Sequence, residues 1–295
     1  METTAAIYLI IAILSSSAMT IVLKLFRNQN GNRYGIILGN YLTCVVIAFF
    51  MLPDKKLVFH PDLTTIICGI MGGILFVAGL VSMQTSIRIN GAILTSAFSK
   101  SGLIVPLLIC ALFLGEELRS IQIPGLLLVF VSFWLISRDK PSSETRSGQG
   151  SGVHPLVLLG VLLFCGGGDA MAKIFDHAGQ RQYDQLYFLI LFGTAAILTA
   201  GLLGAEYKRT GSRPVFREVL AGFAVGIPNY FSSALLLSAL NGLPSFVVYP
   251  CFSSGTLLLV TLVGAAGFKE HLGKKAWTGL AMIAVSLILL NMDVS

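Results

Sequence analysis

Polar and apolar positions fall into long blocks along the chain, and runs of about 20 mostly apolar residues are separated by short polar segments. An α-helix needs about 20 such residues to cross a hydrocarbon core about 30 Å thick. Backbone groups in lipid must be paired within the protein, and no run shows the strict alternation of a barrel strand. An all-α membrane protein is therefore predicted. Its ten transmembrane helices are predicted at residues 5–26, 35–52, 63–84, 91–114, 121–137, 155–175, 184–204, 219–239, 244–267 and 276–292.

The one long polar segment, RDKPSSETRSGQGSGVH at residues 138–154, is rich in Ser, Gly and charged residues. This composition is typical of a flexible linker. It divides the chain into residues 1–137 and residues 155–295, and each part holds five predicted helices. Only 12% of all residues are charged, against about 25% in soluble domains. A multi-pass protein of the cell membrane, inner or plasma, is therefore predicted.

The two parts resemble each other in sequence, which indicates an internal duplication. LKLF at residues 23–26 matches AKIF at residues 172–175. GEELRSIQIPGLLL, beginning at Gly115, matches KEHLGKKAWTGLAM, beginning at Lys269. Because five helices are an odd number, the second part must enter the membrane in the opposite sense to the first. This inverted repeat is typical of secondary transporters, in which two near-equivalent packings open to opposite sides.

With these features the chain resembles the drug/metabolite transporter superfamily, in its EamA-like branch of ten helices in two five-helix repeats. The resemblance covers nearly the whole chain. Its most specific part is the turn before the fifth helix of each repeat, which holds Gly115 and Glu116 in the first copy and Lys269 and Glu270 in the second. Lys269 stands where the family typically has glycine. The resemblance implies the architecture and a transport role, and it names no substrate.

Other classes of function find little support in the sequence. The five cysteines lie in apolar runs without CxxC spacing, so neither a disulfide nor a metal site is predicted. No Walker sequence is present, and no cofactor or nucleic-acid partner is predicted. Clustered nucleophiles or bases at membrane depth are also missing, which argues against an enzyme. A membrane-embedded enzyme or a non-transporting scaffold is the alternative from another class, and both a monomer and a homodimer stay open.

The orientation prediction depends on the basic residues between the helices. Most lysines and arginines fall on the side that the chain reaches at the end of the first helix. The positive-inside rule makes that side cytoplasmic, which places both termini outside. Many relatives in the superfamily place both termini inside, so the residue count and the resemblance conflict, and we follow the count.

Charged residues near the ends of predicted helices have ordinary interpretations. Lys24 and Lys173 occupy equivalent positions in the two repeats, and each is expected to extend its amine to the membrane interface. Glu116 and Glu270 precede the last helix of each repeat, where a carboxylate can cap the helix. Proton coupling through these glutamates is the alternative.

Two charged residues are predicted to lie deep in the membrane. Lys100, in AFSKSGLIVP, lies about nine residues into its predicted helix, roughly 14 Å from one end. Asp169, in GGGDAMAK, lies roughly 21 Å from the same face. Three interpretations of Lys100 stay open: an ion pair with Asp169, an ammonium facing substrate, and a neutral amine. The repeat mates Ser253 and Thr20 are uncharged, as an asymmetric ligand would require, so the substrate-facing interpretation is favoured.

A charged lysine in a central cavity would attract a carboxylate or phosphate and repel a cation. The predicted function is therefore secondary transport of a small polar metabolite, anionic or zwitterionic, coupled to a proton or a counter-transported solute. Efflux of amphipathic drugs is the alternative. Pro106, Pro228 and Pro250 are candidate hinges or tolerated bends. The predicted substrate-binding residues are Lys100, Asp169, Asn40, Tyr41, Ser99, Asn229, Tyr230, Tyr249 and Ser253.

Overall fold

The computed structural model is all-helical over the residues that it describes, which are 2–25, 33–90, 92–116, 120, 122–137, 154–211, 216–267 and 273–291. No strand occurs among these residues, so the predicted all-α class is confirmed. The helices are α1 (Glu2–Leu25), α2 (Arg33–Met51), η1 (Lys55–Phe59), α3 (Leu63–Asn90), α4 (Ala92–Ser101), α5 (Ile104–Phe113), α6 (Gln122–Ser137), α7 (Pro155–Ala178), η2 (Arg181–Tyr183), α8 (Asp184–Thr210), α9 (Phe216–Leu240), α10 (Ser245–Gly267) and α11 (Lys274–Asn291).

Within the described part of the chain, seven helical segments are long and apolar enough to cross a membrane. They lie in α1, α2, α3, α7, α8, α9 and α10, and shorter apolar stretches cover Phe98–Phe113 and Gln122–Ile136. Large apolar side chains such as Phe50, Leu112 and Ile197 are exposed on the outside of the bundle, as lipid contact requires. The chain thus has the character of a multi-pass membrane protein.

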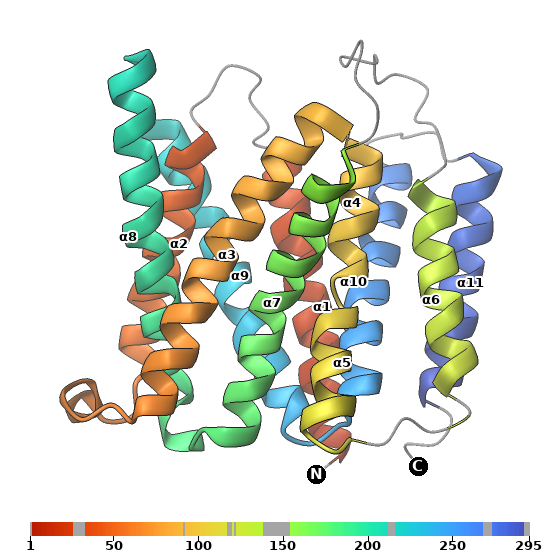
Figure 1. Ribbon diagram of the computed structural model, residues 1–295, viewed down its shortest axis with the longest axis horizontal. Helices are drawn as coiled ribbons and strands as arrows, with labels where there is room; N and C mark the ends of the chain where they lie inside the picture. Colours follow the sequence, from red (N-terminus) through yellow and green to blue (C-terminus); the bar gives the residue numbers. More distant parts are fainter. Residues whose placement is uncertain are drawn as a thin grey trace.

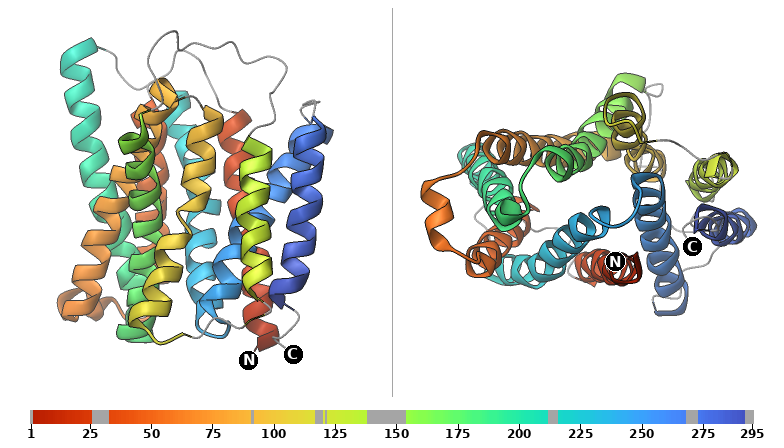
Figure 2. Two further views of the ribbon diagram at one scale, coloured as in Figure 1. Left: turned by 45° about the vertical axis from the view of Figure 1, so that its right-hand side comes forward. Right: turned by 90° about the horizontal axis from the view of Figure 1, so that it is seen from below.

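The helices pack in pairs that bring distant parts of the sequence together. α3 packs on α7 and α8, α2 packs on α8 and α9, and α1 packs on α9 and α10. α4 and α5 both contact α7. α6 and α11 pack on each other and form a pair at one side of the bundle (Figure 2).

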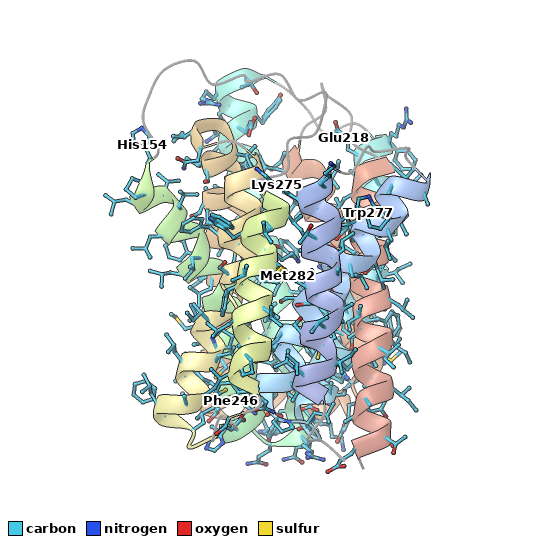
Figure 3. All side chains as sticks on the ribbon, turned by 90° about the vertical axis from the view of Figure 1, so that its right-hand side faces the viewer. His154, Glu218, Phe246, Lys275, Trp277 and Met282 are labelled. Carbon is cyan, nitrogen blue, oxygen red and sulfur yellow. The ribbon has the colours of Figure 1, made fainter. Side chains whose placement is uncertain are left out.

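Contacts at the two ends of the bundle fix the directions of the helices. The backbone N–H of His154, before α7, donates to Asn90 Oδ1 at the end of α3 at 2.8 Å. The Tyr183 hydroxyl, after α7, donates to the carbonyl of His60, before α3, at 3.2 Å. α3 and α7 are therefore antiparallel. Both chain termini lie at the end of the bundle that holds the α7–α8 turn (Figure 1). Phe246, near the start of α10, and His154, before α7, lie at opposite ends of the bundle (Figure 3).

Glycines allow several of these helices to approach backbone to backbone. A Cβ on Gly39 of α2 would lie 2.7 Å from the carbonyl oxygen of Val219 and 3.2 Å from the Cα of Gly222, both in α9. Small residues serve this purpose in membranes, where lipid supplies little hydrophobic drive for helix association.

Buried apolar side chains form two clusters. The first lies among α1, α5, α6, α9, α10 and α11. The second lies among α2, α3, α7, α8 and α9 and is rich in aromatic rings. This second cluster, which includes Tyr187, Phe188 and Phe192 of α8, adjoins the candidate site.

Candidate substrate-binding site

The helix that was predicted as continuous at residues 91–114 is broken between α4 and α5, at Gly102 and Leu103. Pro106 lacks an N–H, so the carbonyl of Gly102 cannot receive the helical bond from a residue four positions later. It accepts instead from the N–H of Val105 at 2.9 Å. Broken transmembrane helices are a recurrent feature of transporter binding sites. Lys100 lies in the last turn of α4, where the negative end of the helix dipole favours a cation.

The α4–α5 break is held against α7. A Cβ on Gly102 would lie 3.0 Å from the backbone nitrogen of Gly166 in α7. The hydroxyl of Ser99 lies 3.6 Å from Cys165 Sγ, also in α7. Asp169 follows Cys165 by four residues, so both lie on the same face of α7. Ser99 and Lys100 are thereby placed on the part of α7 that carries Asp169.

Lys100 and Asp169 are both partly buried, and their charges interact electrostatically. Among the described residues, however, no salt bridge joins them, and neither the ammonium nor the carboxylate has a hydrogen-bond partner. The ion pair that was considered as one interpretation of Lys100 is not formed in this structure. Two opposite charges thus lie in the interior, and neither has a direct partner in the described part of the chain.

Asp169 lines a cavity between α3, α7, α8 and α9. Most of the wall is aromatic or aliphatic, and the polar side chains in it come from Asp169, Tyr187 and Ser233. The Ser233 hydroxyl donates to the backbone carbonyl of Asn229 at 3.1 Å. The Tyr187 hydroxyl is buried and has no hydrogen-bond partner among the described residues. The remaining lining residues are Phe76, Gly168, Ala172, Phe188, Leu191, Phe192, Leu236 and Leu237.

Tyr249 of α10 fixes the backbone beside this cavity. Its hydroxyl donates to the carbonyl oxygen of Asp169 at 2.9 Å, and the side chain is almost fully buried. Tyr249 therefore positions the α7 residue that carries the carboxylate.

Four other predicted residues gather between α2 and α9. The Asn229 amide donates to Asn40 Oδ1 at 3.1 Å. The Tyr230 hydroxyl is bonded to the side chain of Gln185, and the Tyr41 ring lies 6.2 Å from Phe192, which lines the cavity. This group is thus connected to the cavity through aromatic rings. Ser253 lies apart from it, partly buried on α10.

An ionic cluster at one end of the bundle, with a buried lysine at its centre, was not expected from the sequence. Lys173 Nζ lies 2.9 Å from Glu116 Oε1 and 2.8 Å from Asp176 Oδ2. Glu116 also accepts from the backbone N–H of Ser245 at 3.0 Å and from its hydroxyl at 3.1 Å. We call Glu116, Lys173, Asp176 and Ser245 the ionic cluster.

The ionic cluster corrects two interpretations of end charges. Lys173 does not extend to the membrane interface, because its side chain is only 7% exposed and is paired with two carboxylates. Glu116 caps α10, because it accepts from the N–H of Ser245, whereas the prediction named the helix that follows Glu116 in sequence. The side chain of Lys24 and all of Glu270 lie outside the described residues.

The aromatic wall of the cavity was also missed. Its densest part is YFLILF at residues 187–192 of α8, which supplies Tyr187, Phe188 and Phe192. The only signal in the sequence is this local density of rings. Aromatic residues are common in transmembrane helices, so the signal does not separate a cavity wall from ordinary packing.

Comparison with known proteins gives a fold and no activity. No family model matches the chain. A protein of Haemophilus influenzae, described as uncharacterized, is 26% identical over 282 residues, which cover 92% of this chain and 93% of the relative. A crystal structure of another protein matches with a TM-score of 0.75 at 12% identity, covering 99% of this chain and 98% of that one. The shared property is the fold.

Proposed function

We propose that the chain is a secondary transporter that moves a small anionic or zwitterionic metabolite by alternating access through a central cavity. In this proposal it has ten membrane-spanning helices in two inverted repeats, residues 1–137 and 155–295, joined by the linker at 138–154. We place it in the EamA-like branch of the drug/metabolite transporter superfamily. The binding residues are those that gather around the cavity and the α4–α5 break.

The helix contacts support the repeated layout. When the two parts are exchanged, the α3–α7 contact corresponds to α9–α1, and the α2–α9 contact corresponds to α8–α3. The contacts of α4 and α5 with α7 correspond to that of α10 with α1, whereas α2–α8 and α6–α11 correspond to themselves. α1 and α7 also begin at opposite ends of the bundle (Figure 1). Contacts that are exchanged in this way are what an inverted repeat requires.

The observation that carries the proposed function is that the Lys100 and Asp169 side chains have no ion-pair or hydrogen-bond partner among the residues that the structure describes. A charge near the centre of a bilayer costs about 2.5 to 3.5 kcal/mol on the insertion scale, so such residues usually face a cavity or pair with one another. Lys100 lies beside a broken helix of the first repeat, and Asp169 lines a cavity from the second. A zwitterion placed between them would give each charge a partner.

In this proposal the ionic cluster holds one end of the bundle closed. Glu116 belongs to the first repeat, whereas Lys173, Asp176 and Ser245 belong to the second. The cluster therefore joins the two repeats at the end of the bundle that holds the termini, and opening of that end requires its contacts to separate. We assign that end to the outside of the cell by the positive-inside rule. A proton or a counter-transported solute would supply the energy.

Uptake into liposomes tests the proposed function. The purified protein is reconstituted and offered a panel of labelled anionic, zwitterionic and cationic metabolites, with Lys100→Ala as the variant. We expect saturable uptake of an anionic or zwitterionic solute that falls at least tenfold in Lys100→Ala and is partly kept in Lys100→Arg. Lys56→Ala, which removes an exposed lysine in η1, is the matched control. Equal uptake of every anionic solute by wild type and Lys100→Ala would remove the proposed role of Lys100.

Efflux of amphipathic drugs is a second candidate, and the aromatic wall of the cavity favours it. Rings and leucines accept hydrophobic ligands with little regard to their exact shape. The same liposomes discriminate the two functions, because drug efflux should persist in Lys100→Ala whereas anion transport should not.

A further inference from the structure

We propose that the aromatic cavity between α3, α7, α8 and α9 binds an organic ammonium group of the transported molecule. This inference rests on the proposed function, and it narrows the substrate from any small anion or zwitterion to a molecule that carries an alkylammonium. The juxtaposition that carries it is a carboxylate and a buried hydroxyl, each without a hydrogen-bond partner among the described residues, and several aromatic rings around one cavity.

The rings form a continuous wall. Phe175 and Tyr187 are stacked with centroids 4.4 Å apart, and Tyr187 meets Phe188 edge to face at 5.1 Å. Phe188 lies 6.1 Å from Phe192, which in turn lies 6.4 Å from Phe76. Phe76, Tyr187, Phe188 and Phe192 all line the cavity. The face of each ring is its negative side and attracts a cation within about 6 Å of the centroid.

The polar atoms at the wall are acceptors that an ammonium could satisfy. The Asp169 carboxylate accepts no hydrogen bond from the described residues. The Tyr187 hydroxyl is fully buried and has no hydrogen-bond partner within the described ranges, and it is close enough to Asp169 for the two to interact electrostatically. Buried polar groups in proteins are nearly always hydrogen-bonded, so an exception at a cavity wall indicates a ligand. An ammonium has three donors and no acceptor, which matches this pair of oxygens.

Other ligand classes fit the cavity less well. An anion would meet the like charge of the Asp169 carboxylate. A neutral polar molecule would gain nothing from the carboxylate charge. Leu191, Leu236 and Leu237 complete the wall and suit the methyl or methylene groups next to a charged nitrogen. Lys100 interacts with Asp169 from the α4–α5 break, so an anionic end of the same molecule would lie on that side.

Equilibrium binding to the full chain in lipid nanodiscs tests the inference. Three probes share one ring and chain length: phenethylammonium, the neutral 2-phenylethanol and the anionic phenylacetate. We expect phenethylammonium to bind at least tenfold more tightly than either of the others. Asp169→Asn, which keeps the shape of the side chain, should weaken ammonium binding at least tenfold. Glu2→Gln, which neutralises an exposed acid in the first turn of α1, should not change it.

Two further variants keep the test decisive if Asp169→Asn does not fold. Tyr187→Phe removes only the unpartnered hydroxyl, and Phe188→Leu removes a ring while the wall stays apolar. Each should weaken phenethylammonium binding severalfold with little effect on 2-phenylethanol. Equal affinity of phenethylammonium for wild type and all folded variants would overturn the inference and would point to partition into lipid.

Failure of this inference can be separated from failure of the proposed function by measuring uptake on the same preparations. Transport of an anion that depends on Lys100, without selective ammonium binding, would overturn the ammonium site and leave the transporter standing. Selective ammonium binding without uptake of any solute would support the site and overturn the transport function. Selective binding together with uptake of an ammonium-bearing zwitterion, both lost in Asp169→Asn, supports both.

Discussion

Removal of the Lys173 amine should strongly destabilise the protein. Lys173→Met keeps most of the side-chain length and deletes the charge that lies between Glu116 and Asp176, at 2.9 Å and 2.8 Å. Both carboxylates then stay in the cluster without their cation, and the Asp176 side chain is only 7% exposed. Breaking a buried ion pair by removing one partner costs about 3 to 5 kcal/mol.

This cost can be measured as a melting temperature. For domains of 150 to 250 residues, 1 kcal/mol corresponds to about 2 to 4 °C, so Lys173→Met should lower the Tm by roughly 6 to 20 °C. The assay is loss of monodisperse protein on size exclusion after heating in detergent. Lys56→Met, on an exposed lysine in η1, is the control and should leave the Tm within about 2 °C, because surface substitutions usually change stability by less than 0.5 kcal/mol.

A triple variant of the ionic cluster shows whether the destabilisation comes from unpaired charge or from lost packing. Glu116→Gln, Lys173→Met and Asp176→Asn together leave no charge in the cluster. Because neutral replacements of a whole buried ion group are often tolerated, the combined variant should melt well above Lys173→Met. Two results would refute the reasoning: a Tm of Lys173→Met within about 2 °C of wild type, or a combined variant at least as unstable as Lys173→Met alone.

Two further predictions concern the contacts around the site. Gly166→Ala places a methyl against the carbonyl of Gly102, so it should lower the free energy of unfolding by about 1 to 3 kcal/mol. Gly193→Ala in α8 is the control, because nothing lies within 4 Å of the added Cβ, and it should be neutral or stabilising in the same melting assay. Tyr249→Phe removes the hydrogen bond to the Asp169 carbonyl, so it should lower the free energy of unfolding by about 0.5 to 1.5 kcal/mol. It should also lower uptake by more than the loss of stability explains. Unchanged uptake would rule out a positioning role for Tyr249.

The helices could be predicted well from hydropathy, but some of their ends could not. α3 continues to Asn90 and α8 to Thr210, each beyond the apolar run that predicted it. Hydropathy marks the part of a helix that lies in hydrocarbon, while its end is set by local bonds. Asn90, the last described residue of α3, accepts from the N–H of His154, and α8 ends at Gly211, whose φ of 68° favours glycine.

Of the three prolines predicted as hinges or tolerated bends, one lies at a helix break and two lie inside continuous helices. Pro228 and Pro250 lie inside α9 and α10, which are uninterrupted. Pro106 lies in the first turn of α5, directly after a break where Gly102 has no Cβ to separate it from Gly166 of α7. The break therefore combines the missing N–H of Pro106 with a contact between segments about 60 residues apart in sequence, and local sequence patterns do not contain that contact.

Charge identified Lys100 and Asp169 as candidate site residues because either is unusual at membrane depth. The ionic cluster escaped the same reasoning, since Glu116, Lys173 and Asp176 each lie near a helix end, where single charges are ordinary. What makes them unusual is that they meet, and Glu116 and Lys173 come from different halves of the chain. Only the packing of the halves brings them together.

The charges of the ionic cluster are paired, whereas those of Lys100 and Asp169 are not paired among the described residues. Lys173 has two carboxylates within 2.9 Å, whereas Lys100 has no salt-bridge partner among the described residues. A charge that served only stability would be paired, because an unpaired charge in a low-dielectric interior is costly. Lys100→Met should therefore leave the Tm unchanged or raise it while abolishing uptake, the reverse of a residue kept for stability. A fall in Tm comparable to that of Lys173→Met would mean that Lys100 is a structural residue.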